Sequence, residues 1–172
     1  FLAYKDGKVV GRIAGMVNHP SNEAWGQKRA RFGFVDFIDD DEVVDALFGA
    51  VEKWAREQGM EEIHGPMGFT DMDHEGMLIE GFDQIGTMAT IYNYPYYPKQ
   101  VERIGYGKDQ DWHEFKIYIP DGVPEKHLRI GEIVKKKYGL KVLKFKNAKE
   151  IMPYARPVFH TLNCLLYTSD AA

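Results

Sequence analysis

One stretch of the sequence has a clear helical pattern, and it determines how the neighbouring segments must be arranged. Apolar residues recur every three or four positions on one helical face: Val44, Leu47, Phe48, Val51, Trp54 and Ala55. The acidic residues 39–42 supply an N-cap and a capping-box acid, and Gly59 supplies a C-terminal cap. The pattern therefore predicts a helix over residues 42–58 with one buried face.

Strand patterns flank this helix on both sides. Residues 31–37 alternate and are rich in aromatic side chains, and Gly33 inside them indicates a bulge or a close backbone approach. Residues 61–64 form a second short strand, which Gly65 and Pro66 end. A strand, a helix and a strand with short links make a βαβ unit, so we expect these two strands to pair in parallel.

The N-terminal third adds two further elements. An Asp-Gly pair at positions 6 and 7 separates the strand-like runs 2–5 and 9–15, which predicts a hairpin. Residues 19–29 are polar and contain proline and glycine, so we expect a loop there.

The rest of the chain is less regular. Glycines interrupt residues 67–92, which leaves room for at most one helical turn around 77–79. Beyond them, the patterns predict a helix at 96–104, a strand at 112–119, a linker at 120–124, a helix at 125–138, a strand at 141–146 and a helix at 149–162.

The two ends of the chain suggest a fragment. The sequence does not begin with methionine. Residues 164–172 correspond to a translated library adapter from DNA sequencing, so we expect these nine residues to pack poorly. Setting them aside removes the single cysteine, Cys164, and with it any disulfide, thiolate nucleophile or cysteine-ligated metal. A cysteine-free chain fits a reducing cytoplasm.

Charge and hydropathy exclude some classes of partner. The net charge of −4 becomes −3 without Asp170, and this mild acidity argues against nucleic-acid binding. No apolar run approaches the ~20 residues of a membrane helix, so no membrane partner is expected. The lysines at 135–137 end a predicted helix, where a solvated face is the favoured interpretation.

Residues 71–76 imitate the opening of a calcium loop. The twelfth position is Phe82, so the bidentate carboxylate that closes such a loop is missing. His74 has no second histidine at ligand spacing. We therefore expect no metal.

Several stretches carry a resemblance to a known family. They are Gly65-Pro66, residues 75–83, residues 92–97, and the predicted helix 96–104, which follows Asn93 and ends at Gly105. With the order hairpin, strand, capped helix, strand, helix and strand, they resemble the central and C-terminal part of the GNAT (N-acetyltransferase) fold. They also resemble a bacterial subfamily of uncharacterised GNAT-like proteins in which two such units are joined in one chain.

The resemblance implies an α/β fold with a GNAT-like mixed central sheet flanked by helices. It assigns residues 1–119 to one such unit, 120–124 to a linker and 125–163 to the start of a second unit.

The resemblance also implies an N-acyltransferase that moves an acyl group from acyl-CoA to a small-molecule amine. Acyl-CoA would be a co-substrate and no cofactor would be tightly bound. Two departures keep alternatives open. The loop at 38–42 has carboxylates where the family has a glycine-rich pyrophosphate loop, and Val101 stands where many members have a tyrosine acid. The donor could instead be an acyl-carrier protein, or the unit could be a non-catalytic scaffold or substrate lid.

Three residues are candidates for catalysis. Asp36 stands on the strand where the family often has a carboxylate base, although a solvent-facing residue would look the same. His64 ends the parallel strand, near the edge where open α/β sheets bind ligands, but a hydrogen-bonded core histidine is the favoured interpretation. Tyr97 could act as the acid if its helix were displaced.

The aromatic stretch before the predicted helix is the candidate substrate pocket. Its rings offer apolar faces with polar tips, and its prolines restrict the backbone. Packing under a loop explains it equally well. The residues concerned are Tyr92, Asn93, Tyr94 and Tyr96.

Overall fold

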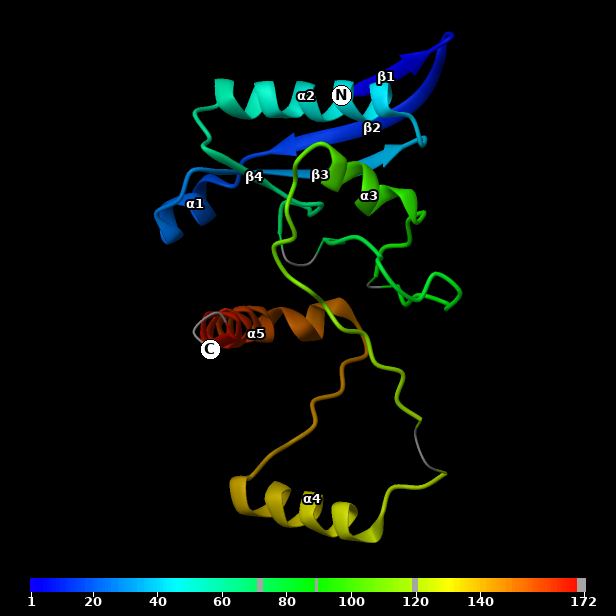
Figure 1. Cartoon of the computed structure of the whole chain (residues 1–172). Coiled ribbons are helices and arrows are strands. Elements are labelled where there is room, and N and C mark those ends of the chain that lie inside the picture. Colours follow the sequence, from blue (N-terminus) through cyan, green and yellow to red (C-terminus); the bar gives the residue numbers. More distant parts are fainter. Residues whose placement is uncertain (71–72, 89, 119–120, 170–172) are drawn as a thin grey trace. The chain divides into compact units, whose positions relative to one another are not determined.

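The computed structural model describes residues 1–70, 73–88, 90–118 and 121–169, with the backbone alone at 163 and 165–169. The chain divides into two units, Phe1–Trp112 and His113–Ala172 (Figure 1). Each unit is described by itself. No helix in the described part is long and apolar enough to cross a membrane.

The first unit is built on a four-stranded mixed sheet with the order β1-β2-β3-β4. The strands are β1 (Leu2–Lys5), β2 (Lys8–Met16), β3 (Arg29–Phe37) and β4 (Glu62–His64). The pairs β1–β2 and β2–β3 are antiparallel, whereas β3–β4 is parallel. The predicted hairpin, the βαβ unit and the α/β class with helices flanking a mixed sheet are confirmed.

Helix α2 (Asp41–Glu57) covers this sheet with the face that the sequence predicts. Asp40 is its N-cap and accepts hydrogen bonds from the backbone N–H groups of Glu42 and Val43 at 3.0 and 3.3 Å. At its other end, Gly59 adopts a φ of 75°, which is unfavourable for residues with a Cβ. The cap predicted at each end is therefore confirmed, but the predicted capping-box acid is wrong, because the third residue after Asp40 is Val43.

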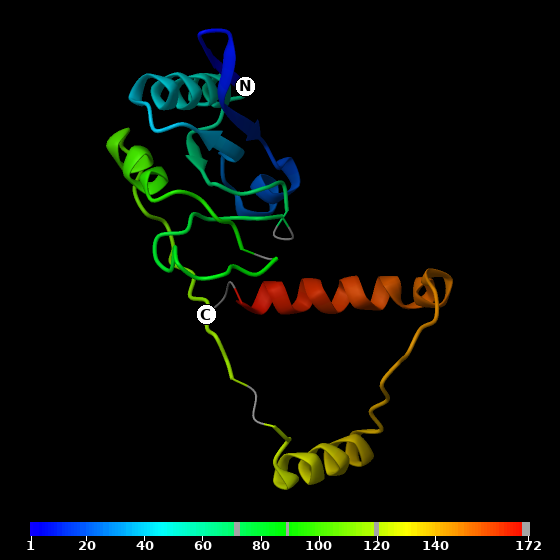
Figure 2. The ribbon, with the colours of Figure 1, turned by 90° about the vertical axis from the view of Figure 1, so that its right-hand side faces the viewer.

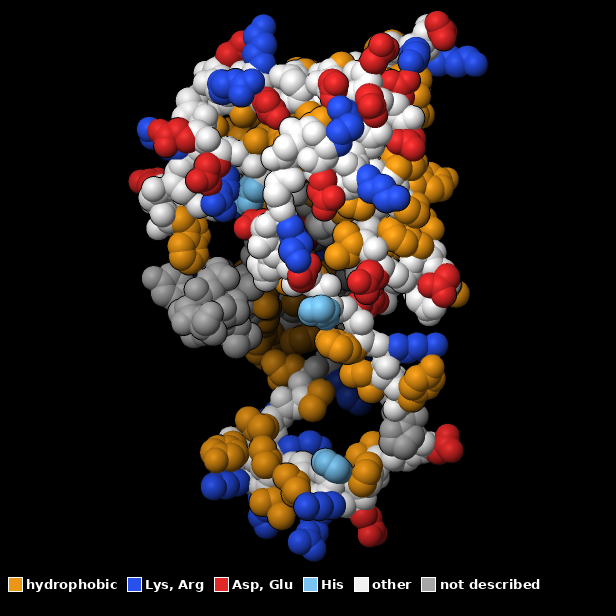
Figure 3. All heavy atoms as spheres, viewed as in Figure 1, with side chains coloured by type: hydrophobic (Ala, Val, Ile, Leu, Met, Phe, Trp, Pro, Cys, Tyr) orange, Lys and Arg blue, Asp and Glu red, His pale blue; other side chains and the backbone are white. Residues whose placement is uncertain are grey.

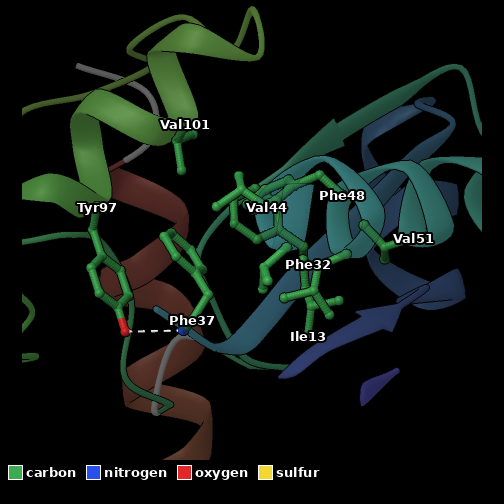
Figure 4. Packing of buried hydrophobic residues seen from close by; sticks show 10 residues of the cluster. Ile13, Phe32, Phe37, Val44, Phe48, Val51, Tyr97 and Val101 are labelled. Carbon is green, nitrogen blue, oxygen red and sulfur yellow. Dashed lines mark hydrogen bonds between the residues drawn. The ribbon is translucent and has the colours of Figure 1, made fainter. Parts of the chain in front are cut away.

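Helix α3 (Tyr96–Arg103) packs into the same core as α2, on the same side of the strands (Figures 1 and 2). Tyr97 and Val101 from α3 join a cluster of buried side chains from the sheet and α2 (Figure 4). The other members are Ile13, Phe32, Phe37, Val43, Val44, Leu47, Phe48 and Val51.

Strand β3 has an irregular centre. Arg12 pairs with Asp36 and Ala14 pairs with Gly33, so β3 carries one extra residue, and Phe34 has a φ of 47°. A Cβ at Gly33 would lie 2.0 Å from the carbonyl oxygen of Met67. The glycine therefore marks both a bulge and a close backbone approach.

Strand β4 pairs with only the first three residues of β3 and then leaves the sheet through a cis Gly65–Pro66 bond. The N–H of Met67 still donates to the carbonyl of Phe32 at 2.9 Å. The described residues of 67–92 contain no helix, so the single helical turn that the sequence allowed around 77–79 does not form.

The loop predicted at 19–29 is also wrong in part, because helix α1 (His19–Trp25) lies there. The side chain of Asn18 caps it by accepting from the N–H of Ser21. Pro20 is tolerated in the first turn, and Gly26 ends the helix with a φ of 62°. None of its residues is buried, so no apolar periodicity announces it.

The second unit contains helices α4 (Glu125–Tyr138) and α5 (Ala148–Ser169), and α5 continues beyond the predicted end at 162. The predicted strands are wrong, because residues 112–118 and 141–146 form no strand. Alternation favours a strand, but a strand needs a hydrogen-bonded partner, and the described unit offers these segments none.

In the C-terminal segment Cys164 is exposed. The side chains of 165–172 lie outside the described residues, so the adapter interpretation stays a prediction.

Candidate functional site

Two of the three predicted catalytic residues meet at the end of β3. The hydroxyl of Tyr97 donates a hydrogen bond to the Asp36 carboxylate, although the two residues are 61 positions apart. The same hydroxyl accepts from the backbone N–H of Phe37 at 3.2 Å (Figure 4). The Asp36–Tyr97 pair is therefore held by the backbone of the strand itself.

The two members of the pair have different environments. Tyr97 is only 6 % exposed, and this burial raises its pKa, as does its hydrogen bond to Asp36. The hydroxyl therefore stays protonated at neutral pH and serves as a donor. Asp36 is exposed, so a ligand can reach its carboxylate.

A row of aromatic rings extends from this pair to the surface. The Phe37 ring stacks on Tyr97, Tyr97 contacts Tyr96, and Tyr96 stacks on the exposed Tyr94 at 5.7 Å between ring centroids. The Tyr96 hydroxyl donates to the carbonyl of Phe37 at 2.7 Å. Of the predicted substrate-binding residues, Tyr96 thus lies beside the Asp36–Tyr97 pair and Tyr94 lies one ring further out.

A hollow of about 430 Å³ opens next to Tyr96. Burial raises the pKa of Tyr96, and the charges of Asp36 and Asp39 raise it further. Tyr96 connects the hollow to the Asp36–Tyr97 pair, because it lines the hollow and its ring lies 4.9 Å from that of Tyr97 between centroids. It is lined by Asp39, Pro95, Tyr96, Lys99, Gln100 and Arg103.

A polar network fixes the wall of this hollow. The buried amide of Gln100 donates to Asp39 and Asp41 at 2.8 and 2.9 Å. Arg103 donates to the amide oxygen of Gln100 at 2.8 Å and pairs with Asp45 at 2.7 Å. These contacts join α3 to the start of α2. The sequence reasoning missed Lys99, Gln100 and Arg103, whose i, i+1, i+4 spacing on one helix was the available signal.

The start of α2 is already capped from within. Asp40 accepts from two of the first backbone N–H groups of the helix, and its carboxylate also pairs with Lys5. These interactions lower the pKa of Asp40, with the Lys5 hydrogen bond as the main cause. The predicted capping by the acidic loop is confirmed, and these helix donors are occupied by a carboxylate.

His64 lies elsewhere. It pairs with Arg31 in the sheet, and Asp36 is five residues further along β3, a separation of at most about 16 Å because the bulge shortens the strand. Burial, followed by the charges of Arg29 and Arg31, lowers the pKa of His64 to about 4. The structure does not bring this neutral, half-buried imidazole to the Asp36–Tyr97 pair.

Asn93 and Tyr92 hold the preceding loop. The buried Asn93 amide accepts from the N–H of Leu78 at 2.6 Å and donates to the carbonyls of Leu78 and Tyr94 at 3.1 Å each. The hydroxyl of Tyr92 donates to the carbonyl of Phe82 at 3.2 Å. Asn93 therefore closes the loop 79–92 at its base, and its predicted contact with substrate stays a prediction.

Within the described residues, no group of three or more His, Cys, Asp or Glu side chains could hold a metal ion. Two residues of the calcium-like stretch, Asp71 and Met72, lie outside the described part.

Comparison with known proteins found two curated relatives. The chain is 32 % identical over 162 residues to protein YghO of Escherichia coli (strain K12). The matched stretch is 94 % of this chain and 42 % of that protein. It is 31 % identical over 126 residues to a bacterial ceramide synthase of Caulobacter vibrioides (strain NA1000 / CB15N). This matched stretch is 73 % of this chain and 33 % of that protein. The chain thus spans less than half the length of either relative. No family model and no solved structure matches it.

Proposed function

We propose that this protein is an N-acyltransferase that transfers an acyl group from a thioester to an amine at the Asp36–Tyr97 pair. The observation that carries the proposal is an exposed carboxylate that a buried, protonated tyrosine holds, with the neighbouring Tyr96 lining a hollow. The similarity to a bacterial ceramide synthase supports it. Ceramide is the amide of a fatty acid with a long-chain amino alcohol, so its synthesis joins an acyl group to an amine.

The residues of the pair suit the proton transfers that this reaction needs. An amine is protonated at neutral pH and must lose a proton before its nitrogen attacks the thioester carbonyl carbon. The exposed Asp36 carboxylate accepts that proton, while Tyr97 fixes the carboxylate in place. As the new C–N bond forms and the C–S bond breaks, the nitrogen loses a second proton and the departing thiolate takes up one, so the net product is amide, thiol and the one proton that Asp36 passes to water. No covalent enzyme intermediate is required, so the chain needs no cysteine nucleophile.

The hollow is the proposed place of the amine acceptor. The Asp39 carboxylate in the lining attracts an ammonium group. Arg103 also lines the hollow, and Asp41 and Asp45 offset its charge. Tyr94, which stacks on Tyr96, extends the aromatic surface of that ring outward. We therefore propose a small-molecule amine, with a long-chain amino alcohol as the first acceptor to test.

The donor is either acyl-CoA or an acyl-carrier protein. Acyl-CoA is the first choice by family resemblance. The start of α2 argues for the alternative, because Asp40 occupies helix donors that would otherwise bind a pyrophosphate. A carrier protein makes weaker demands on such a loop.

The test offers both donors to the complete gene product with a long-chain amino alcohol and detects the amide by mass spectrometry. Product from acyl-CoA alone, or from the carrier alone, identifies the donor. Absence of amide with either donor and a panel of amines contradicts the proposed function.

A second candidate is a non-catalytic unit that serves as a scaffold or substrate lid. It is favoured by Val101, which is buried in the core at the position where a tyrosine acid would be expected. In that case the reaction site would lie in a second GNAT-like unit, which we propose begins at residue 125. We also propose that the protein is cytoplasmic. Unchanged turnover in Asp36→Asn and Tyr97→Phe variants would support this candidate.

A further inference from the structure

The two units carry opposite charge. Residues 1–112 contain 11 Lys and Arg against 20 Asp and Glu, a formal charge of −9. Residues 113–172 contain 11 against 6, a formal charge of +5. The mildly acidic total therefore conceals a basic second unit, and such an asymmetry suggests contact with a polyanion.

Most of this positive charge lies on one segment, residues 125–149, where nine cations stand against two acids. All nine side chains are exposed, and within the described residues only Lys135 pairs with a carboxylate, that of Glu132 at 2.8 Å. We call these nine the basic surface. They are Lys126, Arg129, Lys135, Lys136, Lys137, Lys141, Lys144, Lys146 and Lys149.

Aliphatic side chains stand exposed among these cations. Val142 is 76 % exposed between Lys141 and Lys144, and Leu128 and Ile133 on α4 are both more than half exposed. Figure 3 shows Lys and Arg side chains beside hydrophobic ones over α4. The segment therefore offers charge and apolar contact together.

We propose that the basic surface binds the face of an anionic lipid bilayer. Lys and Arg near such a surface are attracted to its headgroups, and aliphatic side chains beside them can enter the headgroup boundary. A nucleic acid would satisfy the cations but would leave the aliphatic side chains without an apolar partner. The absence of a membrane-spanning run does not bear on this, since peripheral binding needs none. The inference does not depend on acyl transfer at the Asp36–Tyr97 pair, but it requires that Leu128, Ile133 and Val142 stay exposed when the proposed second GNAT-like unit is complete.

The experiment sediments the complete gene product with vesicles of phosphatidylcholine alone or of an equal mixture with phosphatidylglycerol. We expect binding to the mixed vesicles at low salt, where the Debye length is ~30 Å at 0.01 M, and release near 1 M, where it is ~3 Å. Equal binding to both vesicle types, or binding to the mixed vesicles that is insensitive to salt, would overturn the proposal.

The variant to test is Lys141→Gln, Lys144→Gln and Lys146→Gln together, since these residues lie outside the helices. Each lysine charge changes the partition coefficient onto anionic vesicles about fivefold, so loss of the three charges should lower it roughly a hundredfold. The matched control makes the same change at Lys8, Lys28 and Lys53 of the first unit, and we expect less than about a threefold effect.

The controls also separate the alternatives. Circular dichroism checks that both variants keep the helix content of the parent. An equal loss of binding in both variants would mean that net charge, and not this surface, is responsible. Binding to duplex DNA without binding to anionic vesicles would replace the proposal with a nucleic-acid surface.

Discussion

Replacing Tyr97 with Phe tests the geometry of the proposed site with the smallest change. The substitution keeps the ring that stacks on Phe37 and removes only the hydroxyl. That hydroxyl accepts from the N–H of Phe37, a residue 3 % exposed, and donates to Asp36. Leaving a buried N–H without a partner costs about 1–3 kcal/mol, while water can replace the bond to the exposed Asp36. We therefore expect the free energy of unfolding to fall by about 2 kcal/mol.

The assay is urea unfolding followed by tyrosine and tryptophan fluorescence, with an unchanged m-value as the sign of an unaltered unfolded state. The matched control is Tyr94→Phe, whose side chain is 62 % exposed and whose change should stay within about 0.5 kcal/mol. Combining Tyr97→Phe with Asp36→Ala completes a double-mutant cycle. We expect a coupling energy of at least about 0.5 kcal/mol between contacting residues. A loss below 0.5 kcal/mol for Tyr97→Phe together with zero coupling would refute the pair.

Three further predictions concern other parts of the first unit. His64 has a folded pKa of about 4, below its unfolded value of 6.5, so the unfolded state binds more protons between these values. The free energy of unfolding should therefore fall by up to about 2 kcal/mol, after solvent screening, as the pH drops from 6.5 towards 4. His64→Gln should flatten this part of the pH profile of stability. Gly33→Ala should lower the free energy of unfolding, measured by thermal unfolding, by about 3 kcal/mol or more, because its Cβ would meet a backbone carbonyl at 2.0 Å. The control Gly49→Ala, on an open face of α2, should raise it by about 0.5–1 kcal/mol. Asn93→Ala should speed protease cleavage within residues 79–92, since it removes the amide that closes this loop; an unchanged cleavage rate would contradict that role.

The elements that could be predicted from the sequence are those whose signals are local. Helix α2 has both a buried stripe and its own caps, and the hairpin follows from an Asp-Gly pair whose residues both adopt positive φ. Helix α1 escaped prediction because it buries nothing. The strands expected at 112–119 and 141–146 show the opposite error, since alternation gives a preference but cannot supply a neighbouring strand.

In the candidate site, too, single residues could be predicted from the sequence but their contacts could not. Asp36 and Tyr97 could each be singled out from the sequence, but their contact depends on how α3 docks at the end of β3. The hollow was missed because Lys99 and Arg103 look like ordinary solvated helix residues. His64 was expected nearby because β3 and β4 are parallel neighbours. The pairing stops after three residues, which leaves His64 far from Asp36.

The most direct test of the central claim measures amide formation by the complete gene product, with a donor thioester and a long-chain amine, in the parent protein and in Asp36→Asn. Asparagine keeps an oxygen that can accept from Tyr97 but cannot take a proton from the amine. Loss of a general base reduces turnover by about 10²–10⁴-fold, and we predict a loss of that size with an unchanged melting temperature. Amide formation at the parent rate by a folded Asp36→Asn protein would contradict acyl transfer at this pair.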